Sequence, residues 1–216
     1  MRFRDRAEAG RTLAGLLSEL SERGELPDPL VLALPRGGIA VAAPVARALG
    51  APLDVLVVRK IGAPHHEEFA VGALAPGDEP LFDADTLDHL GLTEQRLAPV
   101  VERERRELAR REQLYRGDRP PPDLTGRTVI VVDDGLATGA TARAALRHLR
   151  HRAPARTVLA VPVGAPDSLD LLAAEADLVV CPHRPAAFSA VGQWYDDFEQ
   201  LTDADVLDVL HALHAR

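Results

Sequence analysis

The chain has 216 residues, of which 46% are hydrophobic and 27% charged, and its formal net charge is -8. This composition predicts a globular domain with a sizeable core, excludes a disordered chain, and argues against a nucleic-acid partner. The apolar runs are too short to cross a bilayer and the charged N-terminus lacks a signal peptide's apolar stretch, so we expect a cytoplasmic protein without a membrane partner.

Hydrophobic periodicity predicts alternating helices and strands along the chain. In chain order we predict a helix at 7–23, a strand at 30–34, a helix at 39–49, a strand at 53–58, a polar turn region at 59–68 and a strand at 69–74. There follow a helix at 93–115, a connector at 116–126, a strand at 128–133, a helix at 139–151, a strand at 157–163, a helix at 167–175 and a strand at 178–182. Residues 184–198 are interpreted as irregular, and a last helix at 202–214 has Thr202 as its candidate N-cap. The alternation predicts a single α/β domain with a doubly wound, mostly parallel sheet.

Three details of composition qualify this prediction. The basic residues are 24 arginines and one lysine, Lys60, which suggests that this position needs a compact ammonium group. The helix at 93–115 is rich in Arg and Glu, and we interpret it as a solvated helix with many salt bridges. The single cysteine, Cys181, excludes an internal disulfide and is predicted to be a small buried apolar residue.

One segment, from Val129 to Thr141, carries most of the functional argument. Four β-branched residues are followed by Asp133 and Asp134, and then by a loop of small residues and hydroxyls that enters a helix. Gly135 to Thr141 would suit a phosphate, because glycines allow close approach and a helix N-terminus attracts anions. The two acids would repel a bare phosphate, but they would suit sugar hydroxyls or a metal ion. A phosphorylated sugar satisfies both halves of the segment. The alternative is an α/β protein whose acids bind only a metal.

These thirteen residues resemble the motif with which type I phosphoribosyltransferases bind 5-phosphoribosyl-1-pyrophosphate (PRPP). The resemblance implies that Asp133 and Asp134 contact the ribose hydroxyls. It also implies that the loop binds the 5′-phosphate through Gly135, Leu136, Ala137, Thr138, Gly139, Ala140 and Thr141. No P-loop and no dinucleotide-binding glycine motif occurs in the sequence.

The same resemblance assigns residues to pyrophosphate and to the chemical step. The pyrophosphate would be bound by Arg36, Gly37, Gly38, Arg59 and Lys60. Arg36 and Lys60 would also act in catalysis, together with His65 or His66, which occupy the place of the family's mobile catalytic loop. An alternative for the two histidines is an ordinary solvated loop. Ala63 stands where orotate enzymes carry a further lysine, which argues against orotate as acceptor.

The acceptor is expected beneath an aromatic segment near the C-terminus. Four of the eight aromatic residues fall within residues 188–198, which loosely resemble the base-stacking segment of purine enzymes. The candidates are Phe188, Val191, Gln193 and Trp194. The alternative is a small hydrophobic cap. Ala137 occupies the place of the Asp that hypoxanthine and guanine enzymes usually carry, so the acceptor base stays open.

The resemblance therefore implies one domain spanning residues 1–216, with a core at about 28–182 and a hood at about 1–8 and 184–200. It implies magnesium as cofactor, with Asp133, Asp134 and Asp196 as candidate ligands, and a homodimer. The reaction would displace pyrophosphate from ribose C1 with a nitrogen nucleophile, which we expect to be a nucleobase. The alternatives are a PRPP-sensing regulatory protein without catalysis, and a metal-binding module that does not bind PRPP.

Overall fold

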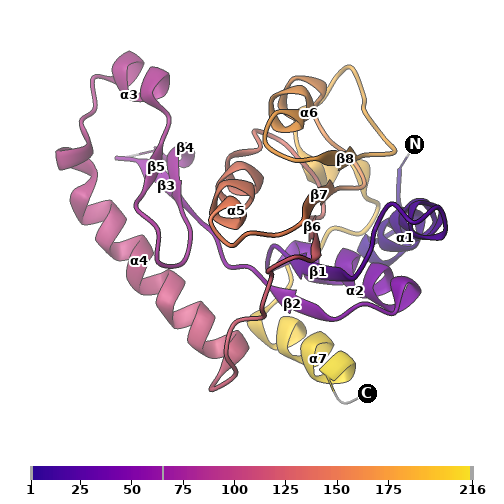
Figure 1. The fold of residues 1–216 in the computed structure, drawn as a ribbon. Helices are drawn as coiled ribbons and strands as arrows, with labels where there is room; N and C mark the ends of the chain where they lie inside the picture. The colour runs from indigo at the N-terminus through magenta and orange to yellow at the C-terminus, as the bar shows by residue number, and fades with distance from the viewer. Residues whose placement is uncertain (1, 65, 215–216) are drawn as a thin grey trace.

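The computed structural model describes residues 2–64 and 66–214, and its larger part is a parallel α/β domain (Figure 1). Five parallel strands lie in the order β2 (Leu53–Val55), β1 (Pro29–Ala33), β6 (Thr128–Val132), β7 (Arg156–Ala160) and β8 (Leu178–Val180). The central strand β6 is buried at every position. Its β-branched side chains suit a strand that is covered on both faces.

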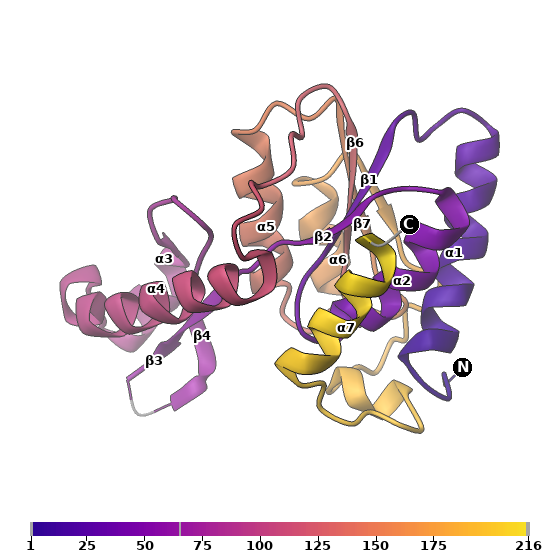
Figure 2. The ribbon, with the colours of Figure 1, turned by 90° about the horizontal axis from the view of Figure 1, so that it is seen from below.

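Helices cover both faces of this sheet (Figures 1 and 2). One core contains residues of α1 (Arg6–Glu22), α2 (Gly37–Leu49) and α7 (Asp203–His214), and the other contains residues of α5 (Ala140–Arg150) and α6 (Pro166–Ala173). Neighbouring residues of β6 point to opposite cores, Ile130 to the first and Val129 to the second. The doubly wound α/β fold is therefore confirmed. No helix in the described part of the chain is both long and apolar enough to cross a membrane.

Residues 59–116 form a second, smaller unit that projects from the parallel domain (Figures 1 and 2). It contains an antiparallel sheet of β3 (Arg59–Ala63), β4 (His66–Leu74) and β5 (Leu81–Phe82), with helices α3 (Ala84–Leu90) and α4 (Glu94–Arg116). The polar turn predicted at 59–68 is wrong, because β3 pairs with β4 in a hairpin with register shifts around Gly62. Ile61 of β3 is fully buried in a small core that also holds Leu97 of α4. One face of this hairpin is apolar, but the polar residues in the sequence of this region made it look like a turn.

Helix α4 is not the uniformly solvated helix that its composition predicts. Leu97, Glu104, Leu108 and Tyr115 are buried along it. At its C-terminal end the Tyr115 hydroxyl donates to Asp203 Oδ1 of α7 at 2.5 Å. The helix therefore runs from the projecting unit back to the parallel domain, and it places several of its arginines beside the carboxyl ends of the strands.

Two predictions about single residues can be compared with the structure. Thr202 caps α7 as expected, since its Oγ1 accepts a hydrogen bond from the Asp205 amide at 3.2 Å. Cys181 is half-buried against the second core, and its thiol donates to the His183 carbonyl at 3.2 Å. Burial raises the pKa of this thiol to about 11, so at neutral pH it is protonated and behaves as a small apolar residue.

The N-terminal residues and the segment between β8 and α7 lie together, and we refer to residues 2–8 and 184–200 as the hood. The Phe3 amide donates to the Trp194 carbonyl at 2.9 Å, and the Asp196 amide donates to the Phe3 carbonyl at 2.8 Å. Phe3 and Tyr195 are almost completely buried, with their ring centroids 5.7 Å apart. Backbone pairing and ring contact therefore join the two hood segments, which are far apart in the sequence.

Candidate active site

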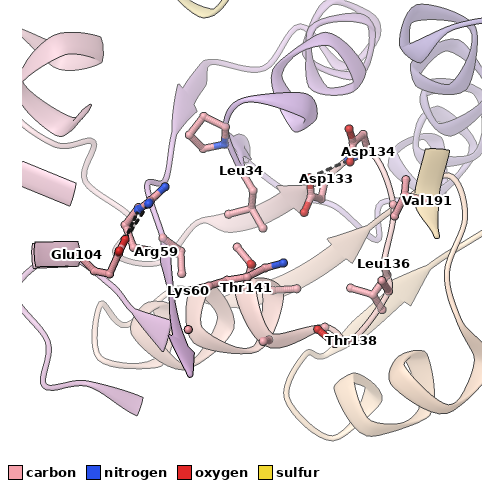
Figure 3. Close-up of a pocket in the computed structure, with 18 of the residues that line it drawn as sticks. Leu34, Arg59, Lys60, Glu104, Asp133, Asp134, Leu136, Thr138, Thr141 and Val191 are labelled. Atoms are coloured by element: carbon pink, nitrogen blue, oxygen red, sulfur yellow. Dashed lines mark hydrogen bonds and ion pairs between the residues drawn. The ribbon is translucent and has the colours of Figure 1, made fainter. Parts of the chain in front are cut away.

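A cavity of about 480 Å³ lies at the carboxyl end of β6, the position where open parallel sheets bind ligands. Residues 133–142 line one side of it, and β3 and α4 contribute the other side (Figure 3). Val191 of the hood lies at the cavity as well, together with Leu34 and Pro35 from the end of β1. The cavity therefore collects residues from five separate stretches of the chain.

Backbone hydrogen bonds to the segment after β7 hold the loop that is predicted to bind the 5′-phosphate. The Leu136 amide donates to the Val163 carbonyl at 2.9 Å, and the Leu136 carbonyl accepts from the Ala165 amide at 2.9 Å. Gly139 has a φ of 76°, a left-handed conformation that favours glycine, and it directly precedes α5. All seven loop residues line the cavity, so the positive N-terminal end of α5 faces it. This arrangement can bind an anion.

The two acids that follow β6 are buried next to each other. Burial raises the pKa of Asp133 well above its ordinary value, and the charge of Asp134 raises it further. Burial also raises the pKa of Asp134, although the ion pair with Arg6, at 2.7 Å between Nε and Oδ2, opposes this effect. Buried carboxylates of this kind gain stabilisation from hydroxyl or cationic partners, which a ligand in the cavity can supply.

The two glycines of the turn after β1 make room for these acids. A Cβ atom on Gly37 would lie 2.0 Å from Asp134 Oδ2, and one on Gly38 would lie 2.6 Å from the Val132 carbonyl oxygen. The preceding Pro35–Arg36 peptide is cis. In the described part of the chain the cavity lining includes Pro35 but not Arg36, Gly37 or Gly38. The glycines therefore pack behind the acid pair, a role that the sequence did not indicate.

Basic residues form the opposite side of the cavity. Lys60 is exposed at its edge, and Arg59 is held by Glu104 of α4, whose Oε2 accepts from Nε at 2.9 Å and from Nη2 at 2.7 Å (Figure 3). Arg103 and Arg111, also from α4, line the same side. A pair of acids and an anion-binding loop on one side of the cavity therefore face a group of cations on the other side.

Arg36 lies outside this lining, near the place where α4 meets α7. Burial and the hydrogen bond to Asp203 raise the pKa of Tyr115, while the positive charges of Arg111 and Arg36 oppose the increase. The positive charges of Arg111 and Arg36 therefore act on the same hydroxyl. Arg36 directly follows Pro35, which belongs to the cavity lining, so this turn lies next to the cavity.

Of the four candidate acceptor residues, the cavity lining contains Val191. Its side chain leans on the loop, because a Cβ on Gly135 would lie 2.4 Å from Val191 Cγ1. Phe188 stacks on Trp194 with centroids 6.2 Å apart, and in the orientation that satisfies its amide Gln193 accepts hydrogen bonds from the Ser189 amide and the Trp194 indole. These three residues contact one another within the hood.

The remaining candidates do not gather around the cavity in the described residues. His65 lies outside the described residues, and the structure describes the backbone of His66 in β4 but not its side chain. Asp196 is exposed, and its Oδ1 lies 3.3 Å from Arg2 Nε. Among the described residues no group of three His, Cys, Asp or Glu side chains could hold a metal ion unaided.

The sequence did not single out Arg6, Arg103, Glu104 or Arg111. Arg6 carried one local signal, a basic residue in the first turn of a helix, where the helix dipole disfavours it. The three α4 residues carried none, because Arg and Glu occur throughout that helix. Their importance depends on how the projecting unit folds back toward β6.

Comparisons with known proteins identify the family. Residues 4–191 match the family model described as phosphoribosyl transferase domain. A Mycobacterium tuberculosis protein with the provisional name phosphoribosyl transferase is 43% identical over 212 residues, which are 98% of this chain and 47% of that protein. A Renibacterium salmoninarum protein named uracil phosphoribosyltransferase is 38% identical over 89 residues, covering 38% of this chain and 42% of its own length.

A solved structure is similar over nearly the whole chain. The crystal structure of TT1426 from Thermus thermophilus is 44% identical and covers 99% of both chains, with a TM-score of 0.82. The chain spans about half the length of the curated Mycobacterium relatives that it matches, at 47%. Since the family model matches most of the chain, and the loop after β6 lies at the cavity as the motif requires, this chain belongs to the phosphoribosyl transferase domain family.

Proposed function

We propose that this chain is a PRPP-dependent phosphoribosyltransferase that displaces pyrophosphate from ribose C1 with a nitrogen nucleophile, such as a nucleobase. One observation carries the proposal: a buried acid pair, an anion-binding loop and a group of cations face a single cavity of about 480 Å³. A phosphorylated sugar that bears pyrophosphate matches all three groups. Its hydroxyls suit the acid pair, its phosphate suits the loop, and its pyrophosphate leaving group suits the cations.

The loop side binds the substrate in this proposal. The segment from Gly135 to Thr141 holds the 5′-phosphate through backbone amides, through the Thr138 and Thr141 hydroxyls and through the N-terminal end of α5. Asp133 and Asp134 accept hydrogen bonds from the ribose hydroxyls, which stabilises both acids in their ionised form. These contacts fix the orientation of C1 relative to the cationic side.

The cationic side stabilises the departing pyrophosphate. Lys60 and Arg59 lie at the cavity, and Arg36 follows Pro35, which lines it. As the bond to C1 breaks, negative charge collects on the pyrophosphate, and these fixed cations lower the energy of that state. Glu104 keeps the Arg59 guanidinium in place and therefore acts as a positioning residue.

The acids in the cavity could supply only some of the ligands that a magnesium ion needs. Of the three carboxylates that the described residues contribute to the cavity lining, Asp134 is paired with Arg6 and Glu104 with Arg59, while Asp133 lies beside Asp134. The other ligands would have to be oxygen atoms of the substrate, which agrees with PRPP arriving as a magnesium complex. Magnesium, when bound, would neutralise part of the pyrophosphate charge.

The acceptor is expected on the hood side of the cavity, where Val191 touches the loop. In this proposal Val191 contacts the acceptor directly, whereas Phe188, Gln193 and Trp194 keep the hood segment in shape. An incoming nitrogen attacks C1 as the bond to pyrophosphate breaks, so that a bond from C1 to nitrogen replaces the bond from C1 to oxygen. A closed hood would keep water from this carbon.

The test is calorimetric titration of magnesium–PRPP into the wild type and into the double variant Asp133→Asn/Asp134→Asn. We expect micromolar-range binding by the wild type and a loss of at least about a hundredfold in the variant, because two charge-assisted contacts are removed. Asp88→Asn, an exposed change of the same chemistry on α3, should bind as the wild type does.

A screen of nucleobases for pyrophosphate release then separates the enzyme from a PRPP-sensing protein. Release with one base supports transfer. Binding without release for any base supports the sensor. A wild type that gives no heat with magnesium–PRPP would overturn the proposed function.

A further inference from the structure

Arg6 occupies a position that its own helix does not explain. It is the first residue of α1, immediately after the N-cap Asp5. The positive end of the helix dipole lies there, so a cation is unfavourable at this position. Despite this, only 10% of the Arg6 side chain is exposed. The reason for an arginine here must come from its partners in the tertiary structure.

Those partners hold the guanidinium group on three sides. Its Nε donates to Asp134 Oδ2 at 2.7 Å, and one terminal nitrogen, Nη1, donates to the Glu199 carbonyl at 2.8 Å. The guanidinium carbon lies 3.9 Å from the centroid of the Phe198 ring. A planar group with fork-like donors suits this site, and a lysine would not make the same set of contacts.

The hood also contacts the loop at two successive residues. The Tyr195 hydroxyl donates to the Asp134 carbonyl at 2.6 Å, and Tyr195 stacks on Phe198 with centroids 5.0 Å apart. Val191 packs against Gly135. The side chain of Asp134 rests against Gly37, so Arg6 and Gly37 confine it from two directions.

We propose that Arg6 is a positioning residue for the sugar-binding acid Asp134, and that the hood residues Phe198 and Glu199 hold its guanidinium group in place. This inference rests on the proposed function, in which Asp134 accepts a hydrogen bond from a ribose hydroxyl. Arg6 occupies Oδ2 and fixes the side-chain torsion, which leaves Oδ1 for the sugar.

Two probes test this inference, magnesium–PRPP, which contains the ribose, and magnesium–pyrophosphate, which does not. Both are titrated into wild type, Arg6→Gln and Arg6→Lys. We expect Arg6→Gln to weaken PRPP binding about tenfold, since a charge-assisted contact is lost, and to leave pyrophosphate binding within about twofold. Arg6→Lys should recover part of the PRPP affinity because it restores the charge without the fork.

The matched control is Arg4→Gln, which changes an arginine of the same segment whose side chain is 71% exposed. Both probes should bind this variant as they bind the wild type. A double-mutant cycle completes the design: in an Asp134→Asn background, Arg6→Gln should cause little further loss, because the two residues act as one unit. Thermal unfolding of each variant confirms that it is folded. If Arg6→Gln does not fold, Arg6→Lys with the two probes decides the question.

Several results would overturn the inference: PRPP binding by Arg6→Gln equal to the wild type, an equal loss of PRPP and pyrophosphate binding, or additive losses for Arg6 and Asp134. A wild type that binds pyrophosphate but not PRPP would instead refute the proposed function, and the inference would fail with it. The wild-type titration therefore distinguishes the two failures.

Discussion

The acid pair in the cavity and an ion-paired carboxylate on the neighbouring helix α4 have pKa values shifted in opposite directions. On the loop side, burial raises the pKa of Asp133 and of Asp134. On the α4 side, hydrogen bonds from Arg110 and Arg111 lower the pKa of Glu107 to about 2, against the effect of burial. The first pair is stabilised by protonation or by a ligand, whereas Glu107 is stabilised by its arginines without a ligand. The raised pKa values of Asp133 and Asp134 therefore fit groups that a ligand stabilises, whereas the lowered pKa of Glu107 fits a group that its own helix already stabilises.

The comparison predicts its largest effect at Gly37, which lies behind the loop-side acids. In Gly37→Ala the new Cβ would lie 2.0 Å from Asp134 Oδ2, so the carboxylate has to move. We expect PRPP affinity to fall by about a hundredfold, since misplacement of a binding group by about 1 Å has effects of this size. Gly15→Ala, where the Cβ meets nothing within 4 Å, should leave the affinity unchanged and stabilise α1 slightly. Equal affinities for the two variants in calorimetry would contradict the packing argument.

A smaller effect is expected from the support on the α4 side. In Glu104→Gln, Arg59 loses its charged acceptor, so we expect pyrophosphate affinity to fall about tenfold and the free energy of unfolding to fall by about 2 kcal/mol. Glu102→Gln is the control, because Glu102 pairs with Arg106 on the exposed face of the same helix. Calorimetry and chemical denaturation measure the two quantities. A Glu104→Gln protein with wild-type values in both would show that Arg59 needs no support.

Arg111 provides a still weaker test of the cationic side. Its side chain is 16% exposed and lies at the cavity, whereas that of Arg106 is 77% exposed on the same helix. We expect Arg111→Gln to weaken pyrophosphate binding about fivefold, and Arg106→Gln to have no measurable effect. If both variants behave alike, Arg111 makes no contribution to the basic side of the cavity.

The smallest effect concerns acid stability. The pKa of Glu107 is lowered from 4.5 to about 2, so its stabilising contribution is complete above pH 4.5 and disappears as the pH falls toward 2. Glu107→Gln should therefore be less stable than the wild type at pH 7, by less than about 1 kcal/mol because the pair is partly exposed, and equally stable near pH 2. Denaturant unfolding at both pH values checks this. A difference that grows on acidification would contradict the sign.

The loop side could be predicted from the sequence because its parts are contiguous. A β-branched strand, two acids and a glycine-rich turn into a helix are adjacent in the chain, so local rules place them together. Thr202 and the doubly wound core were likewise predictable from capping and periodicity.

The α4 side could not be predicted in the same way. The sequence at 59–68 suggested a polar turn, whereas the chain forms the hairpin of β3 and β4 there, with α3 further on. In the hood, the sequence indicated an aromatic segment that would contact the acceptor. In the structure Phe188 stacks on Trp194, and Gln193 accepts a hydrogen bond from the Trp194 indole. In each case the outcome depends on contacts between segments that are distant in sequence, about which local patterns carry no information.

The projecting unit has an evolutionary consequence. Residues 59–116 form one uninterrupted stretch, which leaves the parallel domain after the edge strand β2 and returns before β6. A single recombination event between the codons for these two strands can therefore replace the whole segment that forms one side of the cavity. The loop after β6 and the hood would be inherited unchanged, so descendants could acquire a new pocket shape while keeping the same sugar-binding residues.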